Sequence, residues 1–280
     1  YIGFVYPAGG QQGTTFQVRL GGQGLDDVNE ATVSGTGVSA KVVEYRRRLN
    51  NQELTLLREQ LRELKQGSRA SPGKTGAVPK LAATIERRIG EFVQRPACAS
   101  ISSIVIVEVT MAPDAKPGPR ELILATPRGV SNPLVFHVGQ LPEVSRKPMN
   151  TADEVEDRIT VPCTLNGQIA SGEVNRYRFE ARKGQRLVFS AQARQLVPYI
   201  ADAVPGWFQP VMVLYDARGK ELAYSDDYRF KPDPLILYEV PQDGEYVLQV
   251  TDAIYRGRED FVYRVTIGEL PFVTSVFPLG

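Results

Sequence analysis

Histidine and cysteine are scarce in this sequence of 280 residues, which holds a single histidine, His137, and two cysteines, Cys98 and Cys163. The usual zinc sites need three or four nitrogen or sulfur ligands, which a lone histidine cannot supply. No nucleophile-elbow motif accompanies His137, and its place between the apolar Phe136 and Val138 predicts that it points outward. We therefore expect no catalysis by His137 and no intrinsic hydrolase activity.

The sequence also lacks long apolar runs and an excess of charge of one sign. A membrane-spanning helix needs about 18 or more nearly uninterrupted apolar residues, whereas the strand-like run at 101–111 already contains Ser102, Ser103 and Glu108. Lys and Arg number 33 and Asp and Glu 32, which gives a net charge of +1. We therefore expect no transmembrane segment, and the chain as a whole does not have the charge of a polyanion binder.

What the sequence does contain is a regular alternation of apolar and polar residues. Phe16, Val18 and Leu20 alternate with polar residues, as do Tyr177 and Phe179 in the second half, and half-buried strands show this pattern. From residue 159 onwards about seven short strands are separated by turn signals, a spacing typical of a β-sandwich. We predict a mainly β protein of two β-sandwich domains, at 1–140 and 159–270, joined by a linker over 141–158.

One segment of the first domain departs from this alternation. Leucines recur at i, i+3, i+7 and i+10 over 54–64, the spacing of one helix face, and a second apolar stripe follows. Asn50 or Asn51 can cap the first helix, Gly67 can end it, and Pro79 suits the first position of the second helix. We predict a two-helix hairpin, inserted at about 49–96, that leaves and re-enters the sandwich at neighbouring points.

The region of this hairpin is basic, because residues 44–95 hold 12 Lys and Arg against 6 Asp and Glu. The excess fits either a solvated outer face of two packed helices or a patch that docks on an acidic surface. Nucleic-acid binding is not expected, since the aromatic residues that single-strand binders use for stacking are not interleaved here. We expect the hairpin to dock on a protein partner rather than to complete the core.

Several stretches of the second half occur in a recognisable order. They are NGQI (166–169), VNRYRF (174–179), ARKGQ (181–185), LYDARG (214–219), SDD (225–227) and PQDGEY (241–246). In these stretches residues 159–268 resemble the bacterial pre-peptidase C-terminal (PPC) domain. The resemblance implies a jelly-roll-like sandwich of about eight strands, which serves secreted peptidases and other exported proteins as a non-catalytic accessory domain.

The first half carries less specific motifs. They are VYPAGG (5–10), VRLGG (18–22), PGPREL (117–122) and TPRGVSNP (126–133). In these motifs residues 1–140 resemble the immunoglobulin-like TIG (IPT) module. The helical hairpin departs from the pattern of that family, so we interpret it as an insertion.

The two ends of the chain are similar to each other. IGFVYPAG (2–9) aligns without gaps with VTSVFPLG (273–280). Short strands often run into proline and glycine turns, which is one explanation of the similarity. The other is a tandem array of modules, in which 271–280 begins a further, truncated module.

A calcium site is a further possibility that the PPC resemblance raises. Calcium-binding members of that family resemble one another in an acidic linker and a following Asp-x-Asp element. Asn150, Glu173 and Asn175 keep oxygen-bearing side chains at the matching positions, but Lys147 brings the wrong charge. Calcium needs six to eight oxygen ligands, so we expect no calcium site, little effect of calcium on stability, and no other cofactor.

The two cysteines leave two alternatives open. Cys98 follows the predicted hairpin and Cys163 opens the second domain. An exported chain meets oxidising conditions, so a disulfide that ties the domains is possible, provided that the two Cα atoms lie within about 7 Å. The alternative is two buried free thiols.

The candidate binding residues are mostly aromatic. Trp207, the only tryptophan, and Phe208 lie between proline-containing turns, where they form either a platform for a sugar or peptide or a plug that closes one end of the sandwich. Tyr199 and Tyr228 lie in the same half and would extend a platform. Asp226 and Asp227 complete the candidates, although aspartate is also common in turns.

These observations favour a non-catalytic binding and scaffolding module of an exported bacterial multidomain protein. Its place would be the periplasm, the cell surface or the medium. Its partners would be a protein, a peptide or a glycan, bound by the aromatic loop or the helical hairpin, and the flanking domains of its own chain. Two alternatives remain: accessory domains of a secreted peptidase or other enzyme whose catalytic domain lies outside residues 1–280, and a structural subunit of a cell-surface array.

Overall fold

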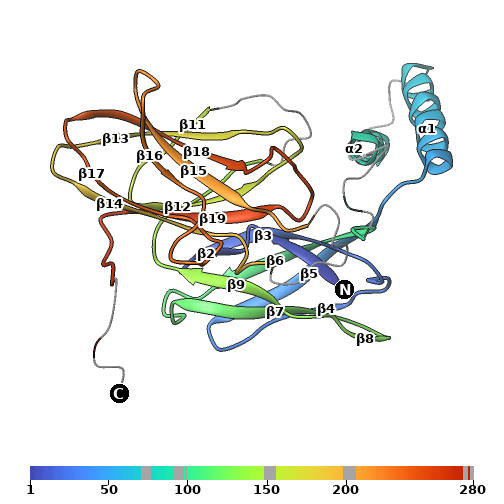
Figure 1. Ribbon diagram of the computed structural model, residues 1–280. Helices are drawn as coiled ribbons and strands as arrows, with labels where there is room; N and C mark the ends of the chain where they lie inside the picture. Colours follow the sequence, from blue (N-terminus) through green and yellow to red (C-terminus); the bar gives the residue numbers. More distant parts are fainter. Residues whose placement is uncertain are drawn as a thin grey trace.

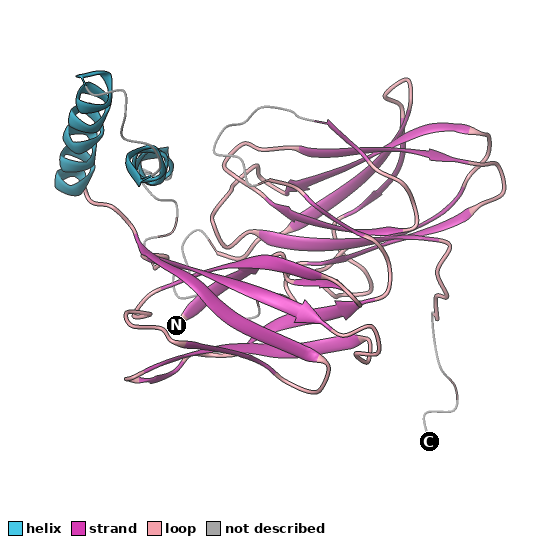
Figure 2. Ribbon diagram, turned by 180° about the vertical axis from the view of Figure 1, so that it is seen from behind, coloured by secondary structure: helices cyan, strands magenta, loops and turns pink. Residues whose placement is uncertain are grey.

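The protein is mainly β, as predicted, and its strands build two β-sandwiches (Figure 1). The computed structural model describes residues 1–70, 77–90, 98, 100–147, 156–197, 206–273 and 277. The two sandwiches lie against each other, and a pair of helices stands apart from both (Figures 1 and 2). No helix in these ranges is long and apolar enough to cross a membrane. The further module predicted at 271–280 falls mostly on 274–276 and 278–280, outside the described residues.

The first sandwich consists of two sheets that are antiparallel apart from the pair β2–β9. The strands of one sheet, in spatial order, are β1 (Ile2–Tyr6), β3 (Thr15–Gly22), β6 (Ser103–Met111) and β5 (Val38–Arg47). Those of the other are β2 (Gly9–Gln11), β9 (Leu134–Gly139), β7 (Gly118–Thr126) and β4 (Glu30–Val33), with β8 (Gly129–Val130) paired to β7.

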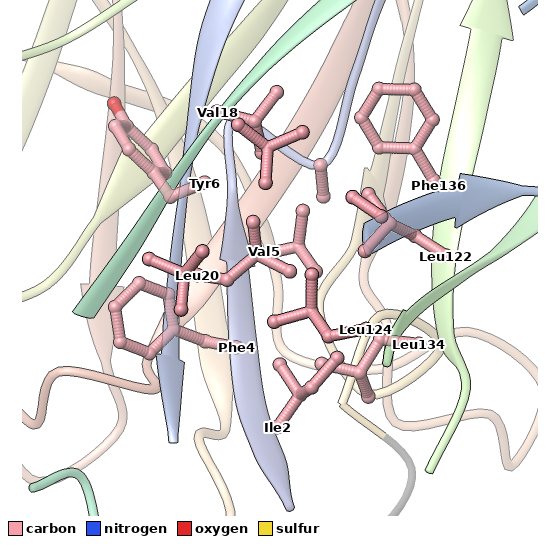
Figure 3. Close-up of a cluster of buried hydrophobic side chains, with 14 of the residues drawn as sticks. Ile2, Phe4, Val5, Tyr6, Val18, Leu20, Leu122, Leu124, Leu134 and Phe136 are labelled. Carbon is pink, nitrogen blue, oxygen red and sulfur yellow. The ribbon is translucent and has the colours of Figure 1, made fainter. Parts of the chain in front are cut away.

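Residue alternation decides which side chains enter the core of the first sandwich. In β9 the residues Leu134, Phe136 and Val138 are buried, while those between them are only half-buried. Figure 3 shows apolar side chains of β1 and β3 packed with those of β7 and β9, whereas the Tyr6 hydroxyl points away from the cluster. Burying each large apolar side chain contributes about 1.5–3 kcal/mol, so this alternation stabilises the sandwich.

The second sandwich also has two sheets, and in each the first strand is parallel to its neighbour and the others are antiparallel. One sheet contains β10 (Glu143–Ser145), β12 (Cys163–Gln168), β19 (Val262–Gly268), β14 (Arg186–Gln192) and β17 (Leu235–Glu239). The other contains β11 (Glu156–Arg158), β13 (Asn175–Ala181), β18 (Gly244–Asp252), β15 (Pro210–Asp216) and β16 (Glu221–Ser225). Tyr177 and Phe179 on β13 are buried between the sheets, as their alternation predicts.

The segment predicted as a linker, 141–158, differs from that expectation where the structure describes it. β10 pairs with β12 and β11 pairs with β13, so both ends of this segment belong to the second sandwich. Each strand has three residues, too few for an alternation to show, and β11 consists of the charged residues Glu156, Asp157 and Arg158. Their pairing comes from neighbouring backbones, which the residue pattern does not reveal.

The predicted helical hairpin consists of α1 (Asn51–Ala70) and α2 (Ala77–Gly90), between β5 and β6. Asn50 caps α1: the Glu53 amide donates to Asn50 Oδ1 at 2.9 Å, and the Asn50 amide donates to Glu53 Oε2 at 2.9 Å. This reciprocal pair is a capping box. Arg47 at the end of β5 pairs with Ser103 at the start of β6, so the insertion leaves and re-enters the sheet at neighbouring points.

Two details of the predicted helix ends are corrected. α1 continues through Gly67 to Ala70, because one interior glycine costs a helix only about 1 kcal/mol. α2 begins at Ala77 rather than at Pro79, which still lies in the first turn, where no proline N–H is required.

Candidate functional site

The junction between the two sandwiches begins at Tyr6. Its hydroxyl leaves the first sandwich and donates to the backbone oxygen of Asn166 at 3.0 Å, and it also contacts the backbone oxygen of Arg146. Tyr6 is 6% exposed, and this burial raises its pKa. A buried hydroxyl with its partners across the boundary fixes the two sandwiches relative to each other.

Arg264 on β19 forms a second set of contacts in the junction. Its guanidinium donates to both carboxylate oxygens of Glu143, at 2.7 and 2.9 Å, and to Asn166 Oδ1 at 2.9 Å. It lies directly on the first sandwich, since a Cβ atom on Gly9 would be 2.5 Å from Arg264 Nη1. Only a residue without a side chain allows this approach.

His137 lies beside this guanidinium and corrects one expectation. As predicted, it does not point into the core of its own sandwich, but it is half-buried and not fully exposed, and its Nε2 atom is buried without a hydrogen-bond partner. Burial, and secondarily the charge of Arg264, lowers the pKa of His137 to about 4. The imidazole is therefore neutral at pH 7 and held in the junction.

A third set of contacts joins the root of the hairpin to the second sandwich. Arg48 pairs with Glu259, and the other carboxylate oxygen of Glu259 accepts from the Cys98 amide at 2.9 Å. Arg258 donates to Cys98 Sγ at 2.9 Å and pairs with Asp260. These contacts link Arg48 and Cys98, at the two ends of the insertion, to the connection between β18 and β19.

Both cysteines are free and buried, so the structure favours the second of the two alternatives that the sequence left open. Burial, and secondarily the charge of Glu143, raises the pKa of the Cys163 thiol to about 11. Cys98 lies against Arg258 and 3.0 Å from Ser100 Oγ.

Two of the weak candidates for metal ligands, Glu173 and Asn175, are buried, and within the described part of the chain each keeps one side-chain oxygen without a hydrogen-bond partner, Glu173 Oε1 and Asn175 Oδ1. Glu173 is 1% exposed, accepts from the Ala170 amide at 2.7 Å, and has its other oxygen 3.5 Å from Arg146 Nε. The Asn175 amide group donates to the Tyr263 hydroxyl at 2.8 Å, and Asn150 lies outside the described residues. A guanidinium thus supplies the positive charge next to Glu173. Within the described ranges, no group of three or more His, Cys, Asp or Glu residues could hold a metal ion.

The aromatic loop combines a plug with a partly exposed ring. Phe208 is 7% exposed and stacks on Phe261 with ring centroids 5.2 Å apart, so it belongs to the core and not to an exposed platform. Trp207 is half-buried, and the guanidinium carbon of Arg194 lies 3.6 Å from its ring centroid. Tyr199 lies outside the described residues. The structure therefore places only Trp207 of this pair at a surface.

The other candidate binding residues lie on the β16–β17 connection. Tyr228 packs edge-on against Phe272, with ring centroids 5.9 Å apart, and not against the aromatic loop. The backbone oxygen of Asp227 accepts from Ser225 Oγ at 2.8 Å, and the Asp226 carboxylate contributes to a raised pKa of Tyr224, after burial. These residues shape the connection and do not extend a platform around Trp207.

Sequence reasoning missed Phe230, at the tip of this connection, which is the most exposed aromatic residue in the described part of the chain. Arg229 and Phe230 have φ values of 50° and 65°, and Tyr228 and Lys231 close the turn with two backbone hydrogen bonds. Phe230 is fully exposed, at 102%. Such turns normally hold Asn and Gly, so the sequence gives no signal for this one.

A small cavity lies beside Trp207, at the side of the second sandwich that meets the first. Its volume is about 10 Å³, room for about one water molecule. Val197 and Val262 on its wall also belong to the core cluster of the first sandwich. The lining residues are Ala193, Arg194, Val197, Trp207, Phe208, Asp260, Phe261 and Val262.

Comparison with known proteins finds structural similarity at low levels. The chain is similar to the pre-peptidase C-terminal domain of a collagenase from Bacillus anthracis, with 17% identity, 42% of this chain and 99% of that one covered, and a TM-score of 0.32. It is also similar to PliG, a periplasmic inhibitor of g-type lysozyme from Aeromonas hydrophila, with 12% identity, 41% and 98% covered, and a TM-score of 0.28. The secreted serine protease VesC from Vibrio cholerae matches 96% of this chain with 49% of its own length, at 12% identity and a TM-score of 0.27.

No protein family and no curated protein matches the sequence. The resemblances to the PPC and TIG families therefore stay predictions. The mainly β architecture with several sheets is shown by the strands themselves.

Proposed function

We propose that this chain is a non-catalytic binding and scaffolding module of an exported multidomain protein, and that the helical hairpin is its docking element. The observation that carries the proposal is the independence of the hairpin from both cores. Among the described side chains of the hairpin, Leu54 and Ile85 are the buried large apolar ones, each 6% exposed, and neither belongs to the core of either sandwich. The resemblance of both halves to modules of exported bacterial proteins supports export.

The contacts of the hairpin with the rest of the chain are concentrated at its root. Arg88 donates to the backbone oxygen of Arg47 at 2.8 Å, and Arg87 lies 3.3 Å from Glu44. Arg47 also pairs with Glu53 in the first turn of α1. These partners lie in the last residues of β5, so the hairpin is oriented by its root, while both helices stand apart from the sandwiches (Figure 2).

The surface that the hairpin presents suits a protein partner better than a glycan. Leu56 is 58% and Leu81 51% exposed, so each helix presents a large apolar side chain to solvent. Basic residues exceed acidic ones by 12 to 6 over 44–95. Apolar contacts set among basic groups fit an acidic protein surface with an apolar centre. The aromatic loop offers less to a glycan, because Phe208 is buried and Arg194 lies over Trp207.

Site-specific photo-crosslinking tests this proposal in the full-length protein in its native cells. A crosslinking amino acid placed at Leu56 or Leu81 is expected to capture the same partner. The control position is Val130 on β8, which is 72% exposed and apolar but lies away from the hairpin (Figure 1). Equal capture at Val130, or none at the hairpin positions, would contradict the proposal.

A further inference from the structure

A guanidinium lies against the carboxylate that the PPC resemblance assigns to calcium. The side chain of Arg146, which directly follows β10, is 4% exposed. Its Nη1 atom donates to Asp157 Oδ2 at 2.9 Å, and its Nε atom lies 3.5 Å from Glu173 Oε1. A buried charge needs either a paired side chain or a metal ion. At Glu173 the chain itself supplies the cation.

A calcium ion does not fit beside this guanidinium. A divalent ion bound by Glu173 would lie next to the positive charge of Arg146, and in a buried site little water screens the repulsion between the two. The oxygens themselves suit a cation, because Glu173 Oε1 and Asn175 Oδ1 are buried and accept no hydrogen bond within the described part of the chain. Arg146 is therefore the side chain that decides against calcium at this place.

The cluster has more negative than positive charge. Two carboxylates, those of Asp157 and Glu173, face the one guanidinium. Burial raises the pKa of Glu173, and the hydrogen bond from the Ala170 amide and the charge of Arg146 lower it by less. Removal of Arg146 would take this cation away from both carboxylates, and a buried charge that loses its partner is strongly unfavourable.

Arg146 also holds distant parts of the chain together. Its amide donates to the backbone oxygen of Asn166 on β12 at 3.0 Å, and its side chain reaches Asp157 on β11. Its backbone oxygen contacts the Tyr6 hydroxyl of the first sandwich. A cation at this point thus keeps the short strands β10 and β11 on the second sandwich, beside the contact with the first.

We propose that Arg146 is a built-in substitute for a structural metal ion, and that its removal converts the cluster into a calcium site. The guanidinium supplies the positive charge that calcium would otherwise supply to Glu173 and Asp157. Without it, these carboxylates and Asn175 Oδ1 are oxygen ligands of the kind that calcium prefers, and water completes the coordination. The inference concerns the second sandwich and is independent of the docking role proposed for the hairpin.

Thermal unfolding with EDTA and with calcium tests the proposal. In EDTA, R146A is expected to have a lower Tm than the unmodified protein. Calcium at 1 mM is expected to raise the Tm of R146A by roughly 3 °C or more, the shift for a Kd of about 0.1 mM in a protein of this size. The unmodified protein is expected to show no such shift, because Arg146 already holds the place.

Two controls separate a new calcium site from a general loss of charge. R146A/E173A lacks one of the two carboxylates and is expected to lose the calcium response. R178A is the matched single variant, because Arg178 also pairs with two carboxylates, those of Glu156 and Glu245. These three side chains are 22%, 33% and 34% exposed, so water solvates the carboxylates once Arg178 is removed, and no calcium response is expected.

R146Q provides a second variant at the same position, in case R146A does not fold in EDTA. Glutamine is neutral but keeps part of the length of arginine, and R146Q is expected to respond to calcium in the same direction. The proposal would be overturned by an equal calcium shift in the unmodified protein or in R178A, by a shift retained in R146A/E173A, or by no shift in either Arg146 variant. Failure of both Arg146 variants to fold in calcium would overturn it as well.

Discussion

Replacement of Arg264 by leucine is expected to lower the free energy of unfolding by about 3–5 kcal/mol, the range for breaking a buried ion pair on one side. The Arg264 side chain is 4% exposed and that of Glu143 10%. The substitution removes two charge-assisted hydrogen bonds to Glu143 and one to Asn166. The Glu143 carboxylate then stays in the junction with the Asn166 amide as its remaining hydrogen-bond donor among these residues.

A loss of this size would be a large part of the whole free energy of unfolding, which is only about 5–15 kcal/mol for a typical domain. The matched control is K65Q. Lys65 and Glu86 are also 2.7 Å apart, but their side chains are 58% and 49% exposed, and exposed pairs contribute at most about 1 kcal/mol. R264L and K65Q each break an ion pair of the same length, but the loss of unfolding free energy is therefore expected to be several times larger for R264L.

Urea unfolding, followed by far-UV circular dichroism and Trp207 fluorescence, measures both variants. The double variant E143L/R264L is expected to lose less than the sum of the two single losses, because it leaves no unpaired charge in the junction. A loss below about 1 kcal/mol for R264L, equal to that of the exposed control, would refute the reasoning. Additive losses in the double variant would refute it as well.

Three further predictions follow from single residues. The folded-state pKa of His137, about 4, lies below its ordinary value of 6.5, so its contribution to stability is complete above pH 6.5 and declines as the pH falls towards 4. NMR titration of this single histidine measures its pKa. That pKa is expected to rise in R264L, which removes the nearby positive charge. A pKa near 6.5 in the original protein would contradict the burial argument. F230G is expected to raise the free energy of unfolding by about 1 kcal/mol. Phe230 has a φ of 65°, and a residue with a side chain costs about that much in the left-handed conformation. A lower stability of F230G in urea unfolding would contradict this prediction. Calcium at 1 mM is expected to shift Tm little, since a tight site would stabilise the folded state visibly; a large shift that E173A removes would show a calcium site at Glu173.

The parts of the fold that follow from local patterns were predictable from the sequence. The leucine spacing over 54–64 and the polar cap at Asn50 predict α1, and the alternation at Tyr177 and Phe179 predicts a buried strand face. Gly67 favours a helix end, but α1 continues past it to Ala70, because one interior glycine costs a helix only about 1 kcal/mol.

Most of the candidate site was not predictable, because it depends on contacts between distant residues. Arg264 and Glu143 are 121 positions apart, and nothing in their local sequence pairs them. The sequence left open whether the aromatic loop is a plug or a platform, and the difference between Phe208 and Trp207 depends on the position of Phe261. The exposed Phe230 occupies a backbone conformation that phenylalanine seldom adopts, so residue preference argues against the turn that is found.

The central claim, that the hairpin serves docking and not the cores, is tested most directly by deleting it. The variant lacks residues 50–96 and carries a short Gly-Ser bridge between the neighbouring ends of β5 and β6. A shorter connection adds little entropic cost, and the ion pairs lost at the root are exposed ones worth at most about 1 kcal/mol each. We predict a strand-type circular dichroism spectrum and a cooperative thermal transition with a Tm close to that of the intact chain. An unfolded or aggregated product would show that Leu54 and Ile85 support the sandwiches, and would contradict the account.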